Sequence, residues 1–254
     1  MRVAVAGGTG TVGRHTLAAL RAAGHDAVSL SRADGVDLRR DGDVARALDG
    51  VDVVVDASNA PGTSRKVAVP FFTEVTGRLQ HQGESAGARR LVTLSIVGND
   101  RVPGYPYYEA KLAQEAAVRR GPLPATVVRA TQFFEFPAQV LRRTAVGPLA
   151  YVFRAAVQPV AARALGGYLA SLAVDPGAPD RVEVAGPGRL ELPAMARDLV
   201  ATSGRRLRVV STTLPGRAGV AMRDGALVPG DGAVVVGPTF ADWLATDDAR
   251  LLSF

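Results

Sequence analysis

The sequence predicts an α/β fold in which helices cover both faces of a doubly wound parallel sheet. Two observations predict it. The first 135 residues alternate short apolar runs with helical patterns, and the predicted strand Val51–Asp56 has a continuous apolar centre, Val53–Val55, as in parallel strands buried on both faces. The first run, Val3–Ala6, also leads directly into a glycine-rich loop and a helical stretch. This order of strand, loop and helix is typical of a Rossmann-type fold.

The individual elements follow from the same periodicities, with Gly24 as a stop for the first helix. Strands are expected at Val3–Ala6, Ala27–Leu30, Gly35–Leu38, Val51–Asp56, Arg90–Val97 and Thr126–Ala130. Helices are expected at His15–Ala23, Asp43–Leu48, Ser64–Ala86 and Tyr107–Arg119.

The pattern changes after Phe136, which predicts a second region. Residues 1–150 are expected to form a dinucleotide-binding core, and residues 151–254 a smaller substrate lobe with a segment at about 152–175 that returns to the core. In this region the sequence predicts helices at Pro137–Thr144, Ala161–Val174 and Leu192–Thr202, and extended chain at Val152–Val160, Val182–Ala185 and Leu207–Thr213. We expect the lobe to lie over the carboxyl edge of the sheet, where ligands bind in such folds.

The glycine loop has the spacing G-x-x-G-x-x-G, formed by Gly7, Gly10 and Gly13. The first glycine permits a tight turn, the second lets the backbone approach a diphosphate, and the third lets the helix pack on the strand. The amides near Thr11 and Val12 then point toward an anion from the start of the helix. The loop therefore predicts a bound dinucleotide, the alternative being an ordinary turn with glycines for packing.

The end of the second strand indicates which dinucleotide is bound. An acidic residue at this position would bond the ribose 2′-hydroxyl of NAD, but the chain has Ser31 and Arg32. Arg32 can pair with a 2′-phosphate, so we expect NADP to be preferred. Asp34 keeps NAD open as an alternative. Further cofactor contacts are expected from Asp37 and Leu38 at the adenine, from Ser58 and Asn59 at the ribose, and from Thr131 near the nicotinamide; Asp37 and Asn59 could equally be turn residues.

Three residues have the chemistry of alcohol–ketone redox catalysis. Ser95 ends an apolar strand, and Tyr107 and Lys111 are four residues apart on a predicted helix and so share a face. A tyrosine hydroxyl can act as general acid or base, and a nearby ammonium lowers its pKa from about 10. Lys111 can also bond the nicotinamide ribose, and Ser95 the substrate carbonyl. Tyr108 is the alternative to Tyr107, and a chance Y-x-x-x-K pattern the alternative to catalysis.

The segment after the next strand is expected to meet the substrate. Gln132, Phe133 and Phe136 are expected to contact it, and the rings of Phe133, Phe134 and Phe136 could form an apolar wall that suits a flat, weakly polar molecule. The alternative for any one of these rings is core packing.

Composition excludes several classes of function. The 254 residues contain no cysteine, which excludes disulfides and thiolate catalysis, and the three histidines are too scattered for a metal site. The net charge of +6 is spread out without interleaved aromatic residues, so no nucleic acid is expected as a partner. No apolar run approaches about 18 residues and no leader is visible, so we expect a cytoplasmic protein without a membrane partner. The oligomeric state stays open.

The motifs resemble those of the short-chain dehydrogenase/reductase superfamily, and within it the atypical, NmrA-like NAD(P)-binding branch. The resemblance is carried by GGTGTVG, SRADGVDL, LSIVG, YYEAKLAQE and VVRATQFFEF, and by VQPVAARALGGYLASLA up to about residue 174. It implies a Rossmann fold with NADP or NAD, and often reduction of a ketone, quinone or unsaturated carbonyl. We therefore expect an NADPH-dependent carbonyl reductase acting on a small apolar or aromatic metabolite. The alternatives are a redox-neutral epimerase, dehydratase or isomerase, and a non-catalytic NADP-sensing regulator.

Overall fold

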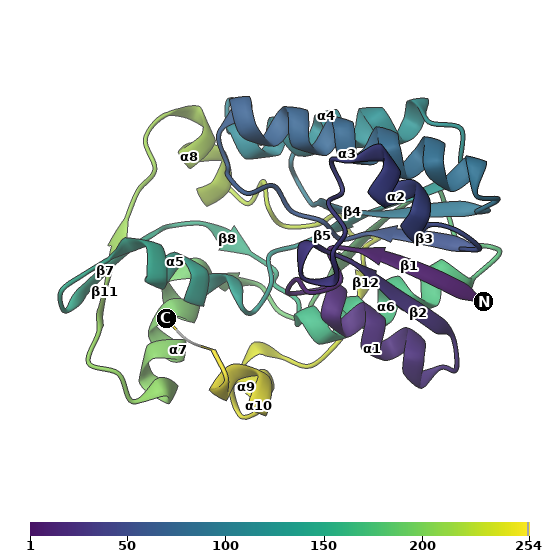
Figure 1. Ribbon diagram of the computed structural model, residues 1–254. Helices are drawn as coiled ribbons and strands as arrows, with labels where there is room; N and C mark the ends of the chain where they lie inside the picture. Colours follow the sequence, from purple (N-terminus) through teal and green to yellow (C-terminus); the bar gives the residue numbers. More distant parts are fainter. Residues whose placement is uncertain (253) are drawn as a thin grey trace. The chain divides into compact units, whose positions relative to one another are not determined.

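The computed structural model describes residues 1–252 and 254. Its main sheet has seven strands in the order β12-β9-β5-β4-β3-β1-β2 (Figure 1). β1 lies between β2 and β3 and is parallel to both, and β3 is parallel to β4. A seven-stranded parallel sheet flanked by helices confirms the fold class that the sequence predicts. The strands are β1 (Arg2–Ala6), β2 (Asp26–Leu30), β3 (Val53–Asp56), β4 (Arg90–Ile96), β5 (Ala125–Ala130), β9 (Arg181–Ala185) and β12 (Val234–Val235).

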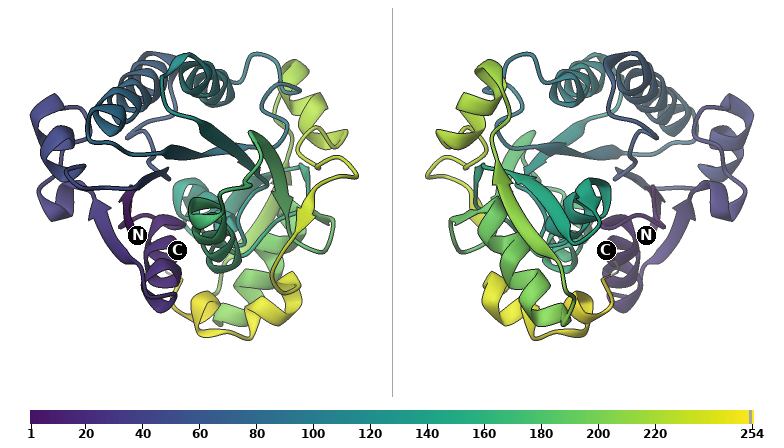
Figure 2. Two further views of the ribbon diagram at one scale, coloured as in Figure 1. Left: turned by 90° about the vertical axis from the view of Figure 1, so that its right-hand side faces the viewer. Right: turned by 90° about the vertical axis from the view of Figure 1, so that its left-hand side faces the viewer.

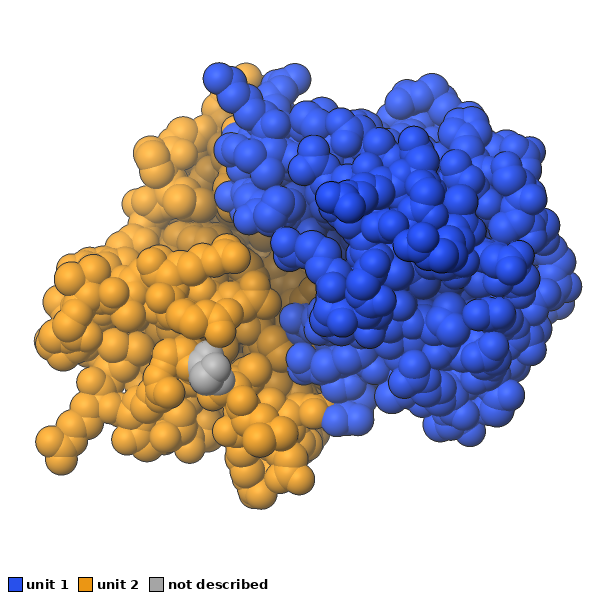
Figure 3. Space-filling model, in the orientation of Figure 1, with its two compact units in different colours: residues 1–96, 106–129, 163–182 blue, residues 97–105, 130–162, 183–254 orange. Residues whose placement is uncertain are grey.

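The chain forms two compact units, coloured separately in Figure 3. Unit 1 contains residues 1–96, 106–129 and 163–182, and unit 2 contains residues 97–105, 130–162 and 183–254. The units interleave along the chain, whereas the sequence suggests one main boundary near residue 150 and one segment, at about 152–175, that returns to the core. That division into a core and a substrate lobe stays a prediction.

In unit 1 the helices form a layer on each side of the strands. The helices α3 (Arg65–Ser85) and α4 (Pro106–Arg120) lie side by side on one face, and α1 (Gly13–Ala22) and α6 (Ala162–Val174) on the other (Figures 1 and 2). The close approach of α1 and α6 requires a glycine, because a Cβ on Gly166 would lie 2.6 Å from the Cβ of His15. The short helix α2 (Asp41–Ala47) packs against α3.

The core of unit 1 explains why these segments become strands. Val54 in β3, Ala4 in β1 and Leu91 in β4 are fully buried in one apolar cluster, together with Leu79 from α3. Continuous apolar runs are stable only where both faces of a strand are covered, and here helices cover both. The placement of these strands follows from that requirement.

One predicted strand is wrong. Gly35–Leu38 forms no strand; the chain makes a short 3-10 helix at Arg32–Asp34 and turns at Gly35, which has a φ of +77°. The carboxylate of Asp34 accepts hydrogen bonds from Ser29 and Ser31, which holds this segment in a tight turn. Leu38 lies in a loop, and its side chain is buried in the core. Its apolar character is therefore explained by burial and does not require a strand.

Unit 2 contains shorter elements around its own apolar cluster. A three-stranded sheet has the order β11-β7-β6, and a two-stranded one pairs β10 with β8. Phe134, Phe240 and Trp243 are buried against one another, with ring centroids 5.2 to 5.6 Å apart. The elements are α5 (Phe136–Thr144), β6 (Ala145–Val146), β7 (Leu149–Phe153), β8 (Ala156–Val157), β10 (Leu190–Glu191), α7 (Leu192–Ser203), β11 (Arg208–Thr212), α8 (Gly216–Arg223), α9 (Phe240–Leu244) and α10 (Asp247–Arg250). The sequence does not predict α8, because its first residues fall in a segment rich in proline and glycine.

None of the helices in the described part of the chain combines the length and the apolar character needed to span a membrane.

Candidate active site

The glycine loop between β1 and α1 is built from backbone alone. Gly7 has a φ of +75°, and its carbonyl accepts a hydrogen bond of 2.9 Å from the Gly10 amide. A Cβ on Gly13 would lie 2.2 Å from the Gly7 oxygen, and a Cβ on Gly7 would lie 2.7 Å from the carbonyl oxygen of Ala57. A larger residue at either position would collide with backbone, so the loop requires glycine there.

The start of α1 offers an anion site beside this loop. The amides of Thr11, Val12 and Gly13 find no acceptor among the described residues, as expected for the first turn of a helix. Their N–H groups and the helix dipole favour a negative group such as a diphosphate. The loop and the helix start therefore fit a dinucleotide.

Two charged residues after β2, Asp34 and Arg32, differ in whether other residues of the described chain already contact their side chains. The Asp34 carboxylate accepts the Ser31 hydroxyl at 2.5 Å and the Ser29 hydroxyl at 2.6 Å, and these two bonds lower its pKa. Arg32 is exposed and forms no ion pair within the described chain. The guanidinium is therefore available for a ligand, whereas the carboxylate already has two donors.

Asp37 and Leu38, expected at the adenine, both have structural contacts. The Asp37 carboxylate accepts the Arg39 amide at 3.0 Å and pairs with Arg40 at 3.8 Å. Leu38 is 9% exposed and packs in the core. Their adenine contacts stay predictions.

The loop after β3 contacts both the glycine loop and α4. Ser58 donates its amide and its hydroxyl to one oxygen of the buried Asp56, at 3.0 and 2.6 Å. The next residue, Asn59, accepts the Tyr107 hydroxyl at 2.7 Å. Because Gly7 packs against Ala57 and Ser58, the phenol is joined to the glycine loop through one short segment.

Tyr107 and Lys111 share a face of α4, as their spacing predicts. The Phe72 ring of α3 contacts both: its centroid lies 5.9 Å from the Tyr107 ring and 4.3 Å from the Lys111 Nζ. Tyr107 is half-buried, whereas Tyr108 is only 8% exposed. This placement favours Tyr107 over Tyr108 as the accessible phenol.

Lys111 is a buried cation, only 4% exposed. Its Nζ donates to the Leu94 carbonyl at 2.8 Å and to the Gln114 side-chain oxygen. Burial lowers the pKa of Lys111 from 10.5 to about 8, and the charges of Asp56 and Glu115 oppose that decrease. The ammonium is thus held rigidly but at an electrostatic cost.

Ser95 faces a different partner from the one expected. Its hydroxyl donates to the Glu115 carboxylate at 2.6 Å, and Glu115 is paired with Arg129 at 2.7 Å. All three side chains are buried. A hydrogen bond to substrate would compete with this arrangement, so the catalytic role of Ser95 stays a prediction.

The sequence analysis missed the buried polar residues Asp56, Gln114, Glu115 and Arg129. Gln114 and Glu115 lie three and four residues after Lys111, so one signal was polar side chains continuing along the buried face of the helix. Nothing local in the sequence identifies their partners on β3 and β5.

The remaining predicted residues belong to unit 2. The Thr131 amide donates to the Val184 carbonyl at 3.0 Å, and the Gln132 carbonyl accepts the Val160 amide at 2.9 Å. The Thr131 hydroxyl oxygen and the Gln132 side-chain oxygen are buried and have no hydrogen-bond partner within the described chain. Phe133 and Phe136 are partly exposed. Polar atoms of this kind are suited to accept a ligand's hydrogen bonds.

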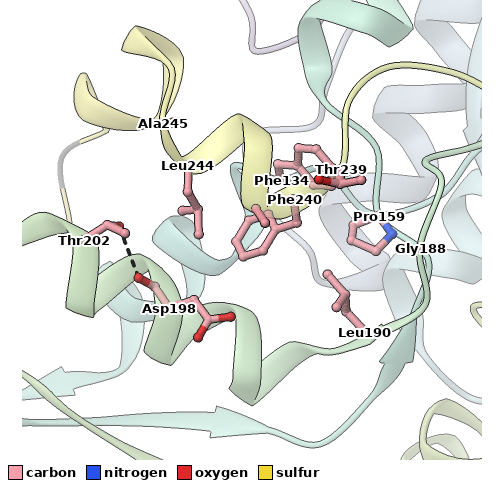
Figure 4. A pocket seen from close by; sticks show the side chains of 11 residues that line it. Phe134, Pro159, Gly188, Leu190, Asp198, Thr202, Thr239, Phe240, Leu244 and Ala245 are labelled. Carbon is pink, nitrogen blue, oxygen red and sulfur yellow. Dashed lines mark hydrogen bonds between the residues drawn. The ribbon is translucent and has the colours of Figure 1, made fainter.

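Unit 2 also contains an apolar pocket of about 520 Å³ between α7 and α9 (Figure 4). Phe134, Phe240 and Leu244 line one part of it, and the Asp198 side chain extends along another. Of the predicted aromatic wall, Phe133 and Phe136 are not among the described residues that line this pocket.

Comparison with known proteins identifies the class of ligand. The profile of the NAD(P)H-binding family matches residues 7–166, which include the glycine loop and Lys111. The chain belongs to this family. The match confirms the expected nicotinamide cofactor, although the choice between NADP and NAD stays open.

The individual relatives and solved structures that match have low sequence identity to this chain. The photosystem II assembly factor Ycf39 of Synechocystis is 27% identical over 149 residues, which cover 53% of this chain and 46% of the relative. The match thus spans about half the length of that relative. A short-chain dehydrogenase/reductase superfamily protein from Agrobacterium tumefaciens, solved with bound NAD, is 19% identical with a TM-score of 0.69, covering 98% of this chain and 96% of that one. The NADPH-dependent quinone oxidoreductase of Escherichia coli is 16% identical with a TM-score of 0.69, covering 96% and 98%. Both structures have the same fold as this chain.

Proposed function

We propose that the protein is an NADPH-dependent reductase that transfers hydride to a carbonyl, of ketone or quinone type, in a small apolar or aromatic metabolite. The observation that carries this proposal is the Tyr107 phenol. It shares a helix face with the Lys111 ammonium, and its hydroxyl contacts Asn59 in the loop that packs against Gly7. A proton donor and a cofactor loop are thus connected within one unit.

The phosphate groups of the cofactor would be held by groups that have no competing partner within the described chain. The amides of Thr11–Gly13 suit the diphosphate, and Arg32 suits a 2′-phosphate because it is exposed and unpaired within the described chain. Bound NADPH supplies the hydride. Ser58 and Asn59 are proposed at the ribose, and Thr131 at the nicotinamide.

Tyr107 is proposed as the general acid that protonates the carbonyl oxygen. A free phenol has a pKa of about 10, and a nearby ammonium favours its ionised form, so Lys111 eases proton release. In this structure the hydroxyl donates its proton to Asn59 at 2.7 Å, so the phenol would exchange this acceptor for the carbonyl oxygen when substrate binds. Ser95 is the expected partner of the carbonyl, in competition with its bond to Glu115.

Gln132, Phe133 and Phe136 are proposed at the substrate. The buried Gln132 oxygen without a partner in the described chain supports a polar contact there, and the partly exposed rings support an aromatic or apolar substrate.

The test uses the Tyr107→Phe variant with Tyr108→Phe as its matched control. NADPH oxidation is followed by its absorbance with a panel of ketones and quinones, and NADPH binding is measured by calorimetry. We expect Tyr107→Phe to lose about a hundredfold in kcat, as for removal of a general acid. NADPH affinity and the activity of Tyr108→Phe should be unchanged.

Three outcomes would contradict the proposal. Unchanged turnover in Tyr107→Phe would remove the proton donor. Product formed without net oxidation of NADPH would indicate an epimerase, dehydratase or isomerase. Tight NADPH binding without turnover of any substrate in the panel would favour a cofactor sensor.

A further inference from the structure

The side-chain amide of Gln114 lies between two opposite charges in unit 1. Its Nε2 donates to the Asp56 carboxylate at 2.9 Å, and its Oε1 accepts from the Lys111 Nζ. A carboxylate only accepts hydrogen bonds and an ammonium only donates them, so the chemistry of the two neighbours fixes the amide orientation. Gln114 and Asp56 are both essentially inaccessible to solvent.

The surroundings of Lys111 show why this amide is important. From α3 the ammonium meets the Phe72 ring, and from β4 the Leu94 backbone carbonyl. The charged groups facing it are Asp56 on β3 and Glu115 on α4. Glu115 is already paired with Arg129 of β5. Asp56 is therefore the carboxylate whose approach to Lys111 the Gln114 amide controls.

Tyr107 is the titratable group on the same face of α4. A lysine in direct contact with a carboxylate forms an ion pair whose field largely cancels at a neighbouring phenol. With an amide in between, the ammonium keeps its charge on the Tyr107 side and still has a fixed position.

We propose that Gln114 is a positioning residue, which holds the Lys111 ammonium on the Tyr107 face of α4 and keeps Asp56 from neutralising it. This inference rests on the proposed function of Tyr107 and Lys111. Burial lowers the pKa of Lys111, and the charges of Asp56 and Glu115 offset that decrease only in part, which agrees with a carboxylate held away from direct contact by the amide.

The test compares Gln114→Glu with Gln80→Glu. Gln80 is also fully buried, but its amide bonds only backbone, the Val118 carbonyl at 3.2 Å and the Leu123 amide at 2.8 Å. Both substitutions place a carboxyl group in the core, and only the first places it against Lys111. The Gln80 variant therefore controls for lost stability.

The first readout is the pKa of Lys111, measured by NMR on protein with isotopically labelled lysine. The sequence has two lysines, and the exposed Lys66 provides an internal reference. We expect Gln114→Glu to raise the Lys111 pKa by about one unit or more and Gln80→Glu to leave it unchanged. The second readout is kcat against pH, where Gln114→Glu should lower kcat about tenfold and shift the Tyr107 limb upward.

Gln114→Met should change the Lys111 pKa in the opposite direction. It also provides a test if Gln114→Glu does not fold. It removes an acceptor from the ammonium, so the Lys111 pKa should fall. Unchanged Lys111 titration in both Gln114 variants, or an equal change in Gln80→Glu, would overturn the inference. A wild-type protein without reductase activity would remove the proposed function, and the NMR measurement would still decide whether Gln114 controls Lys111.

Discussion

The buried ammonium of Lys111 should make the stability of the protein depend on alkaline pH. Its pKa is lowered from 10.5 to about 8 by burial. Below pH 8 the folded and unfolded chains are both protonated at this site, so it contributes no slope. Between pH 8 and 10.5 the unfolded chain binds a proton that the folded chain has released, so the free energy of unfolding rises with pH.

The magnitude follows from the same shift. Each unit of pKa difference is worth about 1.4 kcal/mol, so a pKa lowered from 10.5 to about 8 corresponds to about 3 kcal/mol. Lys111 is almost inaccessible to solvent, so little of this is lost to solvent screening. It should appear as extra stability gained above pH 8.

The assay is urea denaturation at a series of pH values for wild type, Lys111→Met and Lys66→Met. Lys111→Met removes the buried charge, which favours folding. It also leaves the Leu94 and Gln114 oxygens without that donor, at a cost of about 1–3 kcal/mol each, and because the two effects oppose each other we expect the variant to remain folded. From pH 8 to 10.5, wild type should gain about 3 kcal/mol relative to Lys111→Met. Parallel curves for these two proteins would refute the reasoning, and Lys66→Met should follow wild type because Lys66 is exposed.

Three further predictions concern the same unit. Gly13→Ala places a Cβ 2.2 Å from the Gly7 oxygen, so NADPH affinity by calorimetry should fall more than about tenfold; unchanged affinity would mean that the loop can shift. Arg129→Met removes the buried ion-pair partner of Glu115 and leaves the exposed Arg119 at 4.0 Å, so it should lower the free energy of unfolding by about 3–5 kcal/mol in urea. A loss below about 1 kcal/mol would show that Arg119, protonation or hydration compensates. Arg32→Ala should weaken binding of NADPH and leave that of NADH unchanged, and an equal loss for both would exclude Arg32 as the phosphate contact.

Local sequence patterns were sufficient to predict the fold class, the glycine loop and the shared face of Tyr107 and Lys111. Continuous apolar runs such as Val53–Val55 are stable only inside a covered parallel sheet, so the fold class followed from them. Gly7 and Gly13 indicated the dinucleotide loop, because each has a backbone task that another residue cannot perform. The spacing of Tyr107 and Lys111 placed both on one helix face.

The tertiary structure alone decided which polar groups meet, because hydrogen-bond partners across a sheet have no fixed sequence separation. Gln114 meets Asp56 from 58 residues away, and Ser95 meets Glu115 from 20 residues away. Local pattern assigned Ser95 to the substrate, but burial beside Glu115 supplies it with a stronger, charged acceptor. The predicted strand at Gly35–Leu38 was wrong for a related reason. The apolar character of Leu38 indicates that its side chain is buried, but only the tertiary packing decides whether a strand or a loop buries it.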